Sequence, residues 1–346
     1  MQTLPRLYRS EAEAASGGFA PSALSIGNFD GVHLGHRELF RRLAIWGREH
    51  GAKPSVLTFD PHPTRVLAPA RAPRLLSTLA DRAVWMAECG IAQILALPFT
   101  REFSSLSPEQ FVEQIIVGAA GARLVIVGDN FCFGHKQSGD VSTLRALGGR
   151  FGFKTEIVSG VAYRGRAVSS TTVRALLDAG DVAAAARLLT RPYALVGEVV
   201  SGHGIGARQT VPTLNLATAA EVIPASGVYV TRVRDLVSGR SWPSVTNIGV
   251  RPTFEQTDEK VSIESFILSG FTEPAPQRIA VDFLAYLRAE RKFPDSSELR
   301  GQIIKDAGRA QKFHRRIDRW LRIHTSPRNQ PLQSGIYTGE EEGLSE

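Results

Sequence analysis

The stretch Gly27-Asn28-Phe29-Asp30-Gly31-Val32-His33-Leu34-Gly35-His36 separates two segments with different hydrophobic patterns. Before it, Ser22 to Ile26 reads as a short buried strand, and after it apolar residues recur at helical spacing from Leu34 to Glu49. A glycine-flanked turn from a strand into a helix favours phosphate binding, because unpaired backbone N–H groups and the positive end of the helix dipole lie there. The stretch therefore predicts an α/β fold with a phosphate site at this turn.

The histidines His33 and His36 fall at the N-terminus of the predicted helix. Imidazoles titrate near neutral pH and can donate hydrogen bonds to phosphoryl oxygens, whose negative charge grows in a transition state. Gly27 and Gly31 would let the backbone approach a phosphate chain closely. A strand-to-helix turn with incidental histidines is the alternative, and the combination of G-x-x-D-G with H-x-G-H argues against it.

Short apolar runs alternate with amphipathic helical segments from Ser22 to about Arg187. Thr78 and Ser107 are typical helix N-caps. This alternation predicts a mostly parallel, doubly wound, Rossmann-like sheet with helices on both faces, in which ligands bind at the carboxyl ends of the strands. The further strand-like runs are Ser55 to Phe59, Gln93 to Leu97, Leu124 to Val127 and Thr155 to Val158.

A different pattern follows Leu188-Leu189-Thr190-Arg191-Pro192, with short strands broken by Gly, Pro and Asn. It fits a compact antiparallel β-barrel, and a helix is predicted from Ser296 to Ile323. We therefore expect one domain at 1–187, a second at 188–325 and a disordered tail at 326–346. The strands expected in the barrel are Ala194 to Val200, Val228 to Val233, Ser244 to Ile248, Ser262 to Leu268 and Ile279 to Leu287.

Composition favours an intracellular protein. The 346 residues are 43% apolar and contain no run of the roughly 18 apolar residues that a membrane span needs, nor an export signal, so we expect a soluble, cytoplasmic protein. The net charge of +7 gathers between Arg300 and Arg328, which is more typical of a solvated helix face than of a nucleic-acid site. Cys89 and Cys132 form no C-x-x-C pair, and Cys132 is expected to be a small buried hydrophobe. The oligomeric state stays open.

Three more motifs follow predicted strands or open helices in the first domain. His62 lies in F-D-P-H-P, Asn130 in G-D-N-F-C-F-G, and Ser170, Thr171 and Arg174 in S-S-T-T-V-R. Read alone, they are equally a rigid turn, an aromatic core plug and ordinary helix caps. As site residues, the Asn130 amide would supply both a donor and an acceptor, and the Arg174 guanidinium would bind phosphate as a fixed fork.

The second domain carries polar residues suited to phosphoryl transfer. Gly202 and Gly206 precede the run P-T-L-N, in which the Thr213 hydroxyl and the Asn215 carbonyl oxygen are hard ligands suited to Mg²⁺. By itself this run also reads as a turn between strands. Glu264 stands alone in an apolar strand, where a carboxylate is costly without a partner or a task. It is either an edge-facing side chain or a general base.

The extended H-x-G-H run resembles the nucleotidyltransferase signature and, with Phe29-Asp30-Gly31 before it, bacterial bifunctional riboflavin kinases/FMN adenylyltransferases (FAD synthetases). The resemblance extends over roughly Ser22 to Ile323, with several motifs in family order. It implies that His33, His36 and Arg174 are catalytic and that His62 and Asn130 line the flavin and adenine sites. It further implies that the ATP phosphates are bound by Gly27, Phe29, Asp30, Gly31, Ser170 and Thr171.

For the barrel, the resemblance implies ATP binding by Gly202 and Gly206, Mg²⁺ binding by Thr213 and Asn215, and a general-base role for Glu264. It also implies that flavin is bound through Arg288 and Phe293, which lie in a run similar to the family's L-R-x-E-x-K-F. The chain departs from the family's G-R-x-L-G-F-P-T-A-N at 206–215: the arginine is shifted by one, a glycine is threonine and an alanine is leucine.

These features together predict a two-step enzyme. The barrel would phosphorylate riboflavin with ATP to give FMN, and the α/β domain would adenylylate FMN to FAD, so ATP, Mg²⁺ and flavins are the expected small-molecule ligands. One alternative is an FMN adenylyltransferase with a degenerate kinase module. Others are nucleotidyl transfer to a different phosphate acceptor, and a basic protein that binds flavin or nucleic acid without turnover.

Overall fold

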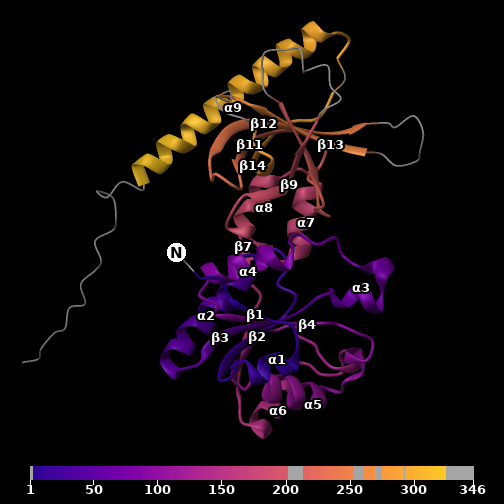
Figure 1. Cartoon of the computed structure of the whole chain (residues 1–346), viewed down its shortest axis with the longest axis vertical. Coiled ribbons are helices and arrows are strands. Elements are labelled where there is room, and N and C mark those ends of the chain that lie inside the picture. The colour runs from indigo at the N-terminus through magenta and orange to yellow at the C-terminus, as the bar shows by residue number, and fades with distance from the viewer. Residues whose placement is uncertain (1–2, 202–212, 252–259, 270–274, 292, 325–346) are drawn as a thin grey trace, which may run out of the picture.

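The computed structural model describes residues 3–201, 213–251, 260–269, 275–291 and 293–324. An α/β domain lies at one end and a β-barrel at the other (Figure 1). Two short helices, α7 (Ser170–Asp178) and α8 (Val182–Leu189), lie between them. This arrangement confirms the predicted fold class. Gly202, Gly206 and the tail at 326–346 lie outside the described residues, so their predictions stay untested.

The N-terminal sheet has six strands in the order β1-β4-β3-β2-β5-β6, and every neighbouring pair is parallel. From β2, the chain adds β3 and β4 on one side and then returns to add β5 and β6 on the other side. The strands β2 and β5 are therefore neighbours although β3 and β4 separate them in sequence. This is the topological switch point at which doubly wound sheets bind ligands. The strands are β1 (Arg6–Tyr8), β2 (Ser22–Ile26), β3 (Lys53–Phe59), β4 (Gln93–Leu97), β5 (Ala122–Gly128) and β6 (Lys154–Val158).

Helices cover both faces of this sheet. Apolar side chains of α2 and α4 pack on one face, and those of α1, α5, η3 and α6 pack on the other. Thr78 and Ser107 are helix N-caps, as predicted, and each forms a capping box. The helices are α1 (Glu11–Ser16), α2 (Leu34–His50), α3 (Pro63–Leu67), α4 (Leu79–Glu88), α5 (Pro108–Phe111), α6 (Val141–Phe151), α7 (Ser170–Asp178) and α8 (Val182–Leu189), with 3-10 turns η1 (Pro69–Arg71), η2 (Phe103–Ser105) and η4 (His135–Gln137) and a π-helical segment η3 (Val112–Ala119).

The second domain is a closed antiparallel barrel in the order β10-β13-β12-β11-β14-β9. The five predicted strands are all present. The reading of P-T-L-N as a turn is wrong, because Thr213 and Asn215 lie on a further strand that pairs with both β9 and β13. The strands are β9 (Tyr193–Val200), β10 (Thr213–Thr218), β11 (Gly227–Asp235), β12 (Ser241–Arg251), β13 (Lys260–Ile267) and β14 (Arg278–Arg288).

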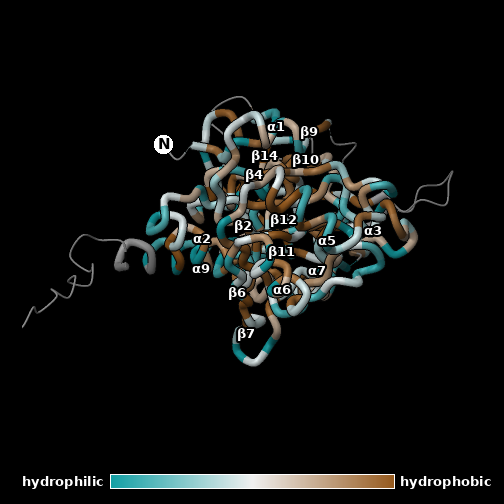
Figure 2. The backbone as a smooth tube through the Cα atoms, turned by 90° about the horizontal axis from the view of Figure 1, so that it is seen from below, coloured by the Kyte–Doolittle hydropathy of each residue, from teal (hydrophilic) through white to brown (hydrophobic). Residues whose placement is uncertain are grey.

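Two sets of helices pack against the barrel. The long helix α9 (Ser296–His324) crosses its outer face, where Ala310 and Phe313 meet valines of β11 and β12 (Figure 1). Residues of α7 and α8 share one hydrophobic core with the barrel interior, including Leu177, Leu188 and Phe283. Figure 2 shows the view from below, in which the β7–β8 hairpin (Ala162–Tyr163 and Arg166–Ala167) projects from the body just before α7.

Candidate active sites

The loop between β2 and α2, residues 27–33, lies at the switch point of the sheet. We call it the phosphate loop. The motifs containing His62 and Asn130 follow β3 and β5, the two strands that flank β2, at the same carboxyl edge. In a parallel sheet the carboxyl ends of neighbouring strands lie at the same edge. The three motifs that the sequence singled out are therefore neighbours in space.

The phosphate loop has an unusual backbone. Phe29, Gly31 and Val32 have φ values of 50°, 77° and 39°. Left-handed φ is easy only for glycine, and for the β-branched Val32 it is a true outlier that surrounding contacts must hold. A side chain at position 31 would also meet Leu76, whose Cδ1 lies 2.9 Å from the place of a Cβ.

The Asp30 carboxylate is the central support of this loop. It is 4% exposed and accepts hydrogen bonds from the amides of Leu76 (3.0 Å) and Ser77 (3.1 Å) and from Arg174 Nη2 (2.9 Å). Ser77 Oγ in turn accepts from the Gly31 amide at 2.9 Å. The carboxylate is thus buried but fully paired, which is the condition for a stable buried charge.

Two further arginines hold the carbonyls of the loop, and the sequence did not single them out. Arg82 of α4, 6% exposed, donates from Nη1 to Asn28 O at 2.6 Å. Arg191, from the segment between α8 and β9, donates from Nη2 to Gly31 O at 2.5 Å and from Nη1 to Val32 O at 3.2 Å. A lone arginine in a helix or linker carries no signal of such a contact.

His33 and His36 stack, with ring centroids 3.6 Å apart. His33 Nδ1 accepts from the His36 amide at 3.4 Å, so in the neutral ring the proton resides on Nε2, which is a donor. Gly35 permits this stack, because a Cβ there would lie 3.3 Å from the His33 ring. His36 Nδ1 is buried and makes no hydrogen bond within the described part of the chain.

Burial keeps both imidazoles neutral. It lowers the pKa of His33 to about 4, with a smaller lowering by the Arg191 charge against a hydrogen bond that raises it. Burial also lowers the pKa of His36 well below its ordinary value, assisted by His33 and Arg82. Neutral imidazoles between buried arginines can donate to anionic oxygens without the cost of a further buried charge. The loop can therefore donate hydrogen bonds to anionic oxygens.

The second helix start, α7, meets the phosphate loop. Ser170 Oγ donates to Asp30 O at 2.9 Å, and Ser169 is the N-cap. Arg174 pairs with Asp30 and donates from Nε to Arg74 O at 2.7 Å. Thr171 is exposed at the first turn. The structure therefore brings Ser170 and Arg174 to the loop, and it uses two Arg174 nitrogens for protein contacts.

His62 caps α3 through Nδ1, which accepts from the Thr64 amide at 3.2 Å. Burial lowers its pKa, while Asp30 raises it and Arg174 lowers it, so both lie within electrostatic range of the ring. Asn130 is exposed after β5. Cys132, expected to be buried, is exposed, because alternate side chains of this turn, Phe131 and Phe133, take the inward positions.

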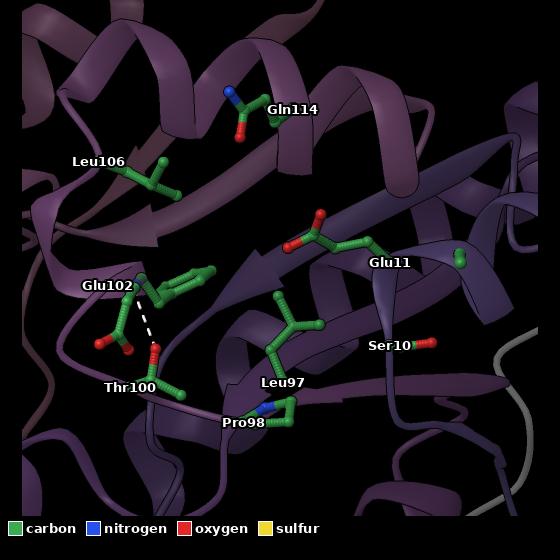
Figure 3. A pocket seen from close by; sticks show the side chains of 10 residues that line it. Ser10, Glu11, Leu97, Pro98, Thr100, Glu102, Leu106 and Gln114 are labelled. Carbon is green, nitrogen blue, oxygen red and sulfur yellow. Dashed lines mark hydrogen bonds between the residues drawn. The ribbon is translucent and has the colours of Figure 1, made fainter.

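Six phenylalanines connect the His62 and Asn130 motifs through a chain of ring contacts with centroids 5.4–6.1 Å apart. Beside this chain is an open depression of about 550 Å³, with Leu97, Pro98 and Phe103 as apolar walls and Glu11 and Glu102 at its rim (Figure 3). The ligand edge of the sheet is therefore aromatic and apolar next to the phosphate loop. The members of the chain are Phe59, Phe99, Phe103, Phe111, Phe131 and Phe133.

Strand register places the candidate residues of the barrel in one row. Glu264 of β13 lies opposite Asn215 of β10 on one side and Asn247 of β12 on the other. Directly opposite residues in antiparallel strands have Cβ atoms about 5 Å apart and point to the same face. The neighbours Leu214, Ile263 and Ile248 point into the core, so this row faces outward. Asn247 is a candidate that the sequence did not single out.

The remaining barrel candidates lie at the contact with α9. Arg288 donates from Nε to the buried Asp306 of α9 at 2.9 Å, and its guanidinium lies 5.8 Å from the Phe293 ring centroid. Arg291 lies over the same ring at 4.5 Å. The predicted flavin residues Arg288 and Phe293 are thus brought together. Thr213 is exposed two residues before Asn215, on the same side of β10.

Comparisons with known proteins agree with this two-site arrangement. A family model for FAD synthetase matches residues 18–172, and one for riboflavin kinase matches residues 189–314. A bifunctional riboflavin kinase/FMN adenylyltransferase from Pseudomonas fluorescens is 37% identical over 83% of this chain and 91% of its own. The chain belongs to the bifunctional riboflavin kinase/FMN adenylyltransferase family. The relative from Escherichia coli (strain K12) is 33% identical over 84% of this chain and 92% of its own.

A crystal structure of a macrolide-efflux protein from Streptococcus pneumoniae has the same fold, with a TM-score of 0.79 and 25% identity over 89% of this chain and 99% of that one. No helix within the described residues is long and apolar enough to cross a membrane. For a riboflavin kinase/FMN adenylyltransferase, the two matched segments separate the candidate residues of the two sites, except Arg174, which lies between the segments. The phosphate loop lies in the FAD synthetase segment and the Glu264 row in the riboflavin kinase segment.

Proposed function

We propose that adenylyl transfer takes place at the phosphate loop and riboflavin phosphorylation on the outer barrel face around Glu264. The protein is a bifunctional flavin-cofactor enzyme that makes FMN from riboflavin and FAD from FMN, with ATP as co-substrate of both steps. The observation that carries the division between sites is their separation. The Asp30-anchored loop is built from the α/β domain, and the Asn215–Glu264–Asn247 row from three barrel strands.

In the adenylyl step, an oxygen of the FMN phosphate attacks the α-phosphorus of ATP in line, and the bond to the bridging oxygen breaks so that pyrophosphate leaves. The protein has no covalent role, so it acts by positioning and charge stabilisation. His33 Nε2–H and His36 would donate to the leaving phosphates, and Gly27, Phe29, Asp30 and Gly31 shape the loop. Ser170, Thr171 and the Arg174 Nη1 would complete the phosphate site from α7.

The aromatic edge supports flavin binding beside the phosphate loop. An isoalloxazine ring is flat and largely apolar, and it gains most from contact with aromatic side chains. The phenylalanine chain ends at the motifs that contain His62 and Asn130. We assign flavin and adenine binding to these two residues. His62 would lie between the ring site and the phosphates, since Asp30 and Arg174 act on it electrostatically.

In the kinase step, the ribityl 5′-hydroxyl attacks the γ-phosphorus of ATP and ADP leaves, with Glu264 accepting the hydroxyl proton. Asn215 and Thr213 lie on the side of β10 that faces outward together with Glu264 of β13. Their side-chain oxygens fit Mg²⁺, which takes few oxygens from the protein and several from phosphates or water. When bound, this ion would neutralise phosphate charge. We assign ATP binding to Gly202 and Gly206, and flavin binding to Arg288 and Phe293.

We further propose domains at 1–187 and 188–325 and a cytoplasmic location with small-molecule partners. Two free thiols, Cys89 and Cys132, support a reducing compartment. Nucleic acid is not a proposed partner. The basic helix α9 packs on the barrel through its apolar side, and its Arg232–Asp318 and Arg288–Asp306 ion pairs serve that packing.

A flavin product assay on two variants tests the division. With riboflavin, ATP and Mg²⁺, Glu264→Ala should make no FMN but still convert supplied FMN to FAD. His36→Ala should make FMN but no FAD. If both products fall together in either variant, the sites are not separate. If the unaltered protein converts FMN to FAD but makes no FMN from riboflavin, the kinase module is degenerate.

A further inference from the structure

Arg191 lies in the segment matched to riboflavin kinase, yet it contacts the phosphate loop of the other domain. It follows α8 in the segment that leads into the first barrel strand, and its side chain extends back to the α/β domain. The guanidinium donates to Gly31 O and Val32 O, and also to Leu189 O at 2.8 Å. Its flat face lies 3.4 Å from the centroid of the Trp85 ring on α4.

These contacts fix the guanidinium in three ways at once. Trp85 holds its plane by a cation–π contact, Leu189 O ties it to α8, and two donors remain for the loop. The two carbonyls belong to the peptide units on either side of the Val32 Cα, and both Gly31 and Val32 have positive φ. A strained backbone persists only where neighbours over-determine it, and Arg191 supplies the hydrogen bonds on this side of the loop.

The Arg191 charge also acts on the histidine that follows. His33 is 6% exposed, and the Arg191 charge contributes to lowering its pKa after the larger effect of burial. Burial lowers the pKa of Arg191 to about 9, which leaves it charged at neutral pH. Protonation of His33 would occupy Nδ1 and break its hydrogen bond from the His36 amide. The charged groups around this pair are Arg37 from α2, Asp81, Arg82 and Glu88 from α4, and the thiol of Cys89.

We propose that Arg191 is a positioning residue for adenylyl transfer: from the segment between the domains, its hydrogen bonds to Gly31 O and Val32 O hold the phosphate loop in its active form. The kinase domain thereby takes part in the FAD step without contributing a group to the reacting atoms. This inference rests on the assignment of adenylyl transfer to the phosphate loop, which the His36→Ala variant tests separately.

The test compares three full-length variants in steady-state FAD formation from FMN and in FMN formation from riboflavin. Arg191→Met removes the charge and the donors, and Arg191→Lys keeps the charge but loses the fork. Arg187→Met alters an exposed arginine one turn earlier and is the control. For Arg191→Met we expect kcat for FAD formation to fall by about 10–100-fold with a smaller change in KM for ATP, because a loop displaced by about 1 Å loses catalysis on this scale.

The pH profile separates positioning from general stability. In Arg191→Met the acid limb of kcat for FAD formation should move to higher pH, because one cause that lowers the His33 pKa is gone. In Arg191→Lys it should stay in place while kcat is intermediate, and the kinase rate should be unchanged in both. A wild-type kcat and profile in Arg191→Met would overturn the proposal, as would an equal fall of both activities. If Arg191→Met does not fold, a wild-type kcat in Arg191→Lys would overturn it.

Discussion

The phosphate loop and the Glu264 row place their polar groups by different means. The loop is held by side chains from four distant segments: Asp30 binds amides at Leu76 and Ser77, and arginines come from α4, α7 and the segment between the domains. In the row on the barrel, strand register sets the alignment, since β10, β13 and β12 place Asn215, Glu264 and Asn247 opposite one another through backbone pairing.

Function and stability should be coupled in the phosphate loop and separate in the Glu264 row. A change in the loop's supports removes buried hydrogen bonds and alters the site together, because the same groups serve both. A change on the outward row removes chemistry and leaves the main-chain ladder intact. Variants of equal size in the two regions should therefore differ in their effect on folding.

Glu264→Gln should lower riboflavin phosphorylation by about 10²–10⁴-fold, since general-base catalysis contributes on this order. FAD formation from FMN and the urea midpoint should stay unchanged. The control is Glu198→Gln on β9, an exposed carboxylate of the same barrel. Separation of flavins after reaction gives both rates. A loss of stability in Glu264→Gln would break the comparison, because it would show that this side chain supports the barrel.

Asp30→Asn should destabilise the protein by about 3 kcal/mol and also reduce FAD formation. An amide in this place would turn N–H groups toward Arg174 Nη2 and the Leu76 amide, so buried donors would lose their acceptor. Asp178→Asn is the control: it removes the partner of Arg74 in a pair whose side chains are about half exposed, and such pairs contribute little. Urea unfolding gives the free energies. Equal effects in the two variants would contradict a central role for Asp30.

His36→Ala should reduce FAD formation by about 10²–10³-fold, the usual loss for one preorganised donor to transition-state charge, with the kinase rate unchanged. His50→Ala, at the exposed end of the same helix, is the control. An unchanged rate of FAD formation in His36→Ala would remove this imidazole from the site and leave phosphate binding to His33, Ser170 and Arg174.

Much of the fold was readable from the sequence, because buried parallel strands are continuous apolar runs and their helices carry caps. The predicted strands at Ser22–Ile26 and Gln93–Leu97 match the observed bounds. The strands β1 and β10 were missed. The first is only three residues long at a sheet edge, and the second begins at Thr213 within the P-T-L-N run, whose composition suggests a turn.

The site was readable only in part. Motif spacing found the histidines, Asp30, Ser170 and Glu264, since these residue types are unusual at such positions. It did not find Arg82 and Arg191, because their acceptors are backbone carbonyls that any sequence provides. Nor did it show that Arg174 pairs with Asp30, since that contact depends on how α7 packs against the loop. Contacts between distant segments require the fold itself.

A further prediction concerns pH and the buried His33. In the folded protein the pKa of His33 is about 4, below its ordinary value of 6.5. At neutral pH the imidazole is therefore neutral in both the folded and the unfolded protein, and its titration has no effect on stability. As the pH falls below 6.5 only the unfolded state gains the proton, and stability decreases until about pH 4, by at most roughly 3 kcal/mol. We would measure the urea midpoints of the wild type and His33→Gln from pH 7.5 to 4. Above pH 6.5 the two midpoints should change with pH in the same way, and below pH 6.5 the wild-type midpoint should fall more steeply. Parallel curves would mean that His33 is accessible to protons in the folded loop, and the loop would then be as open as the Glu264 row.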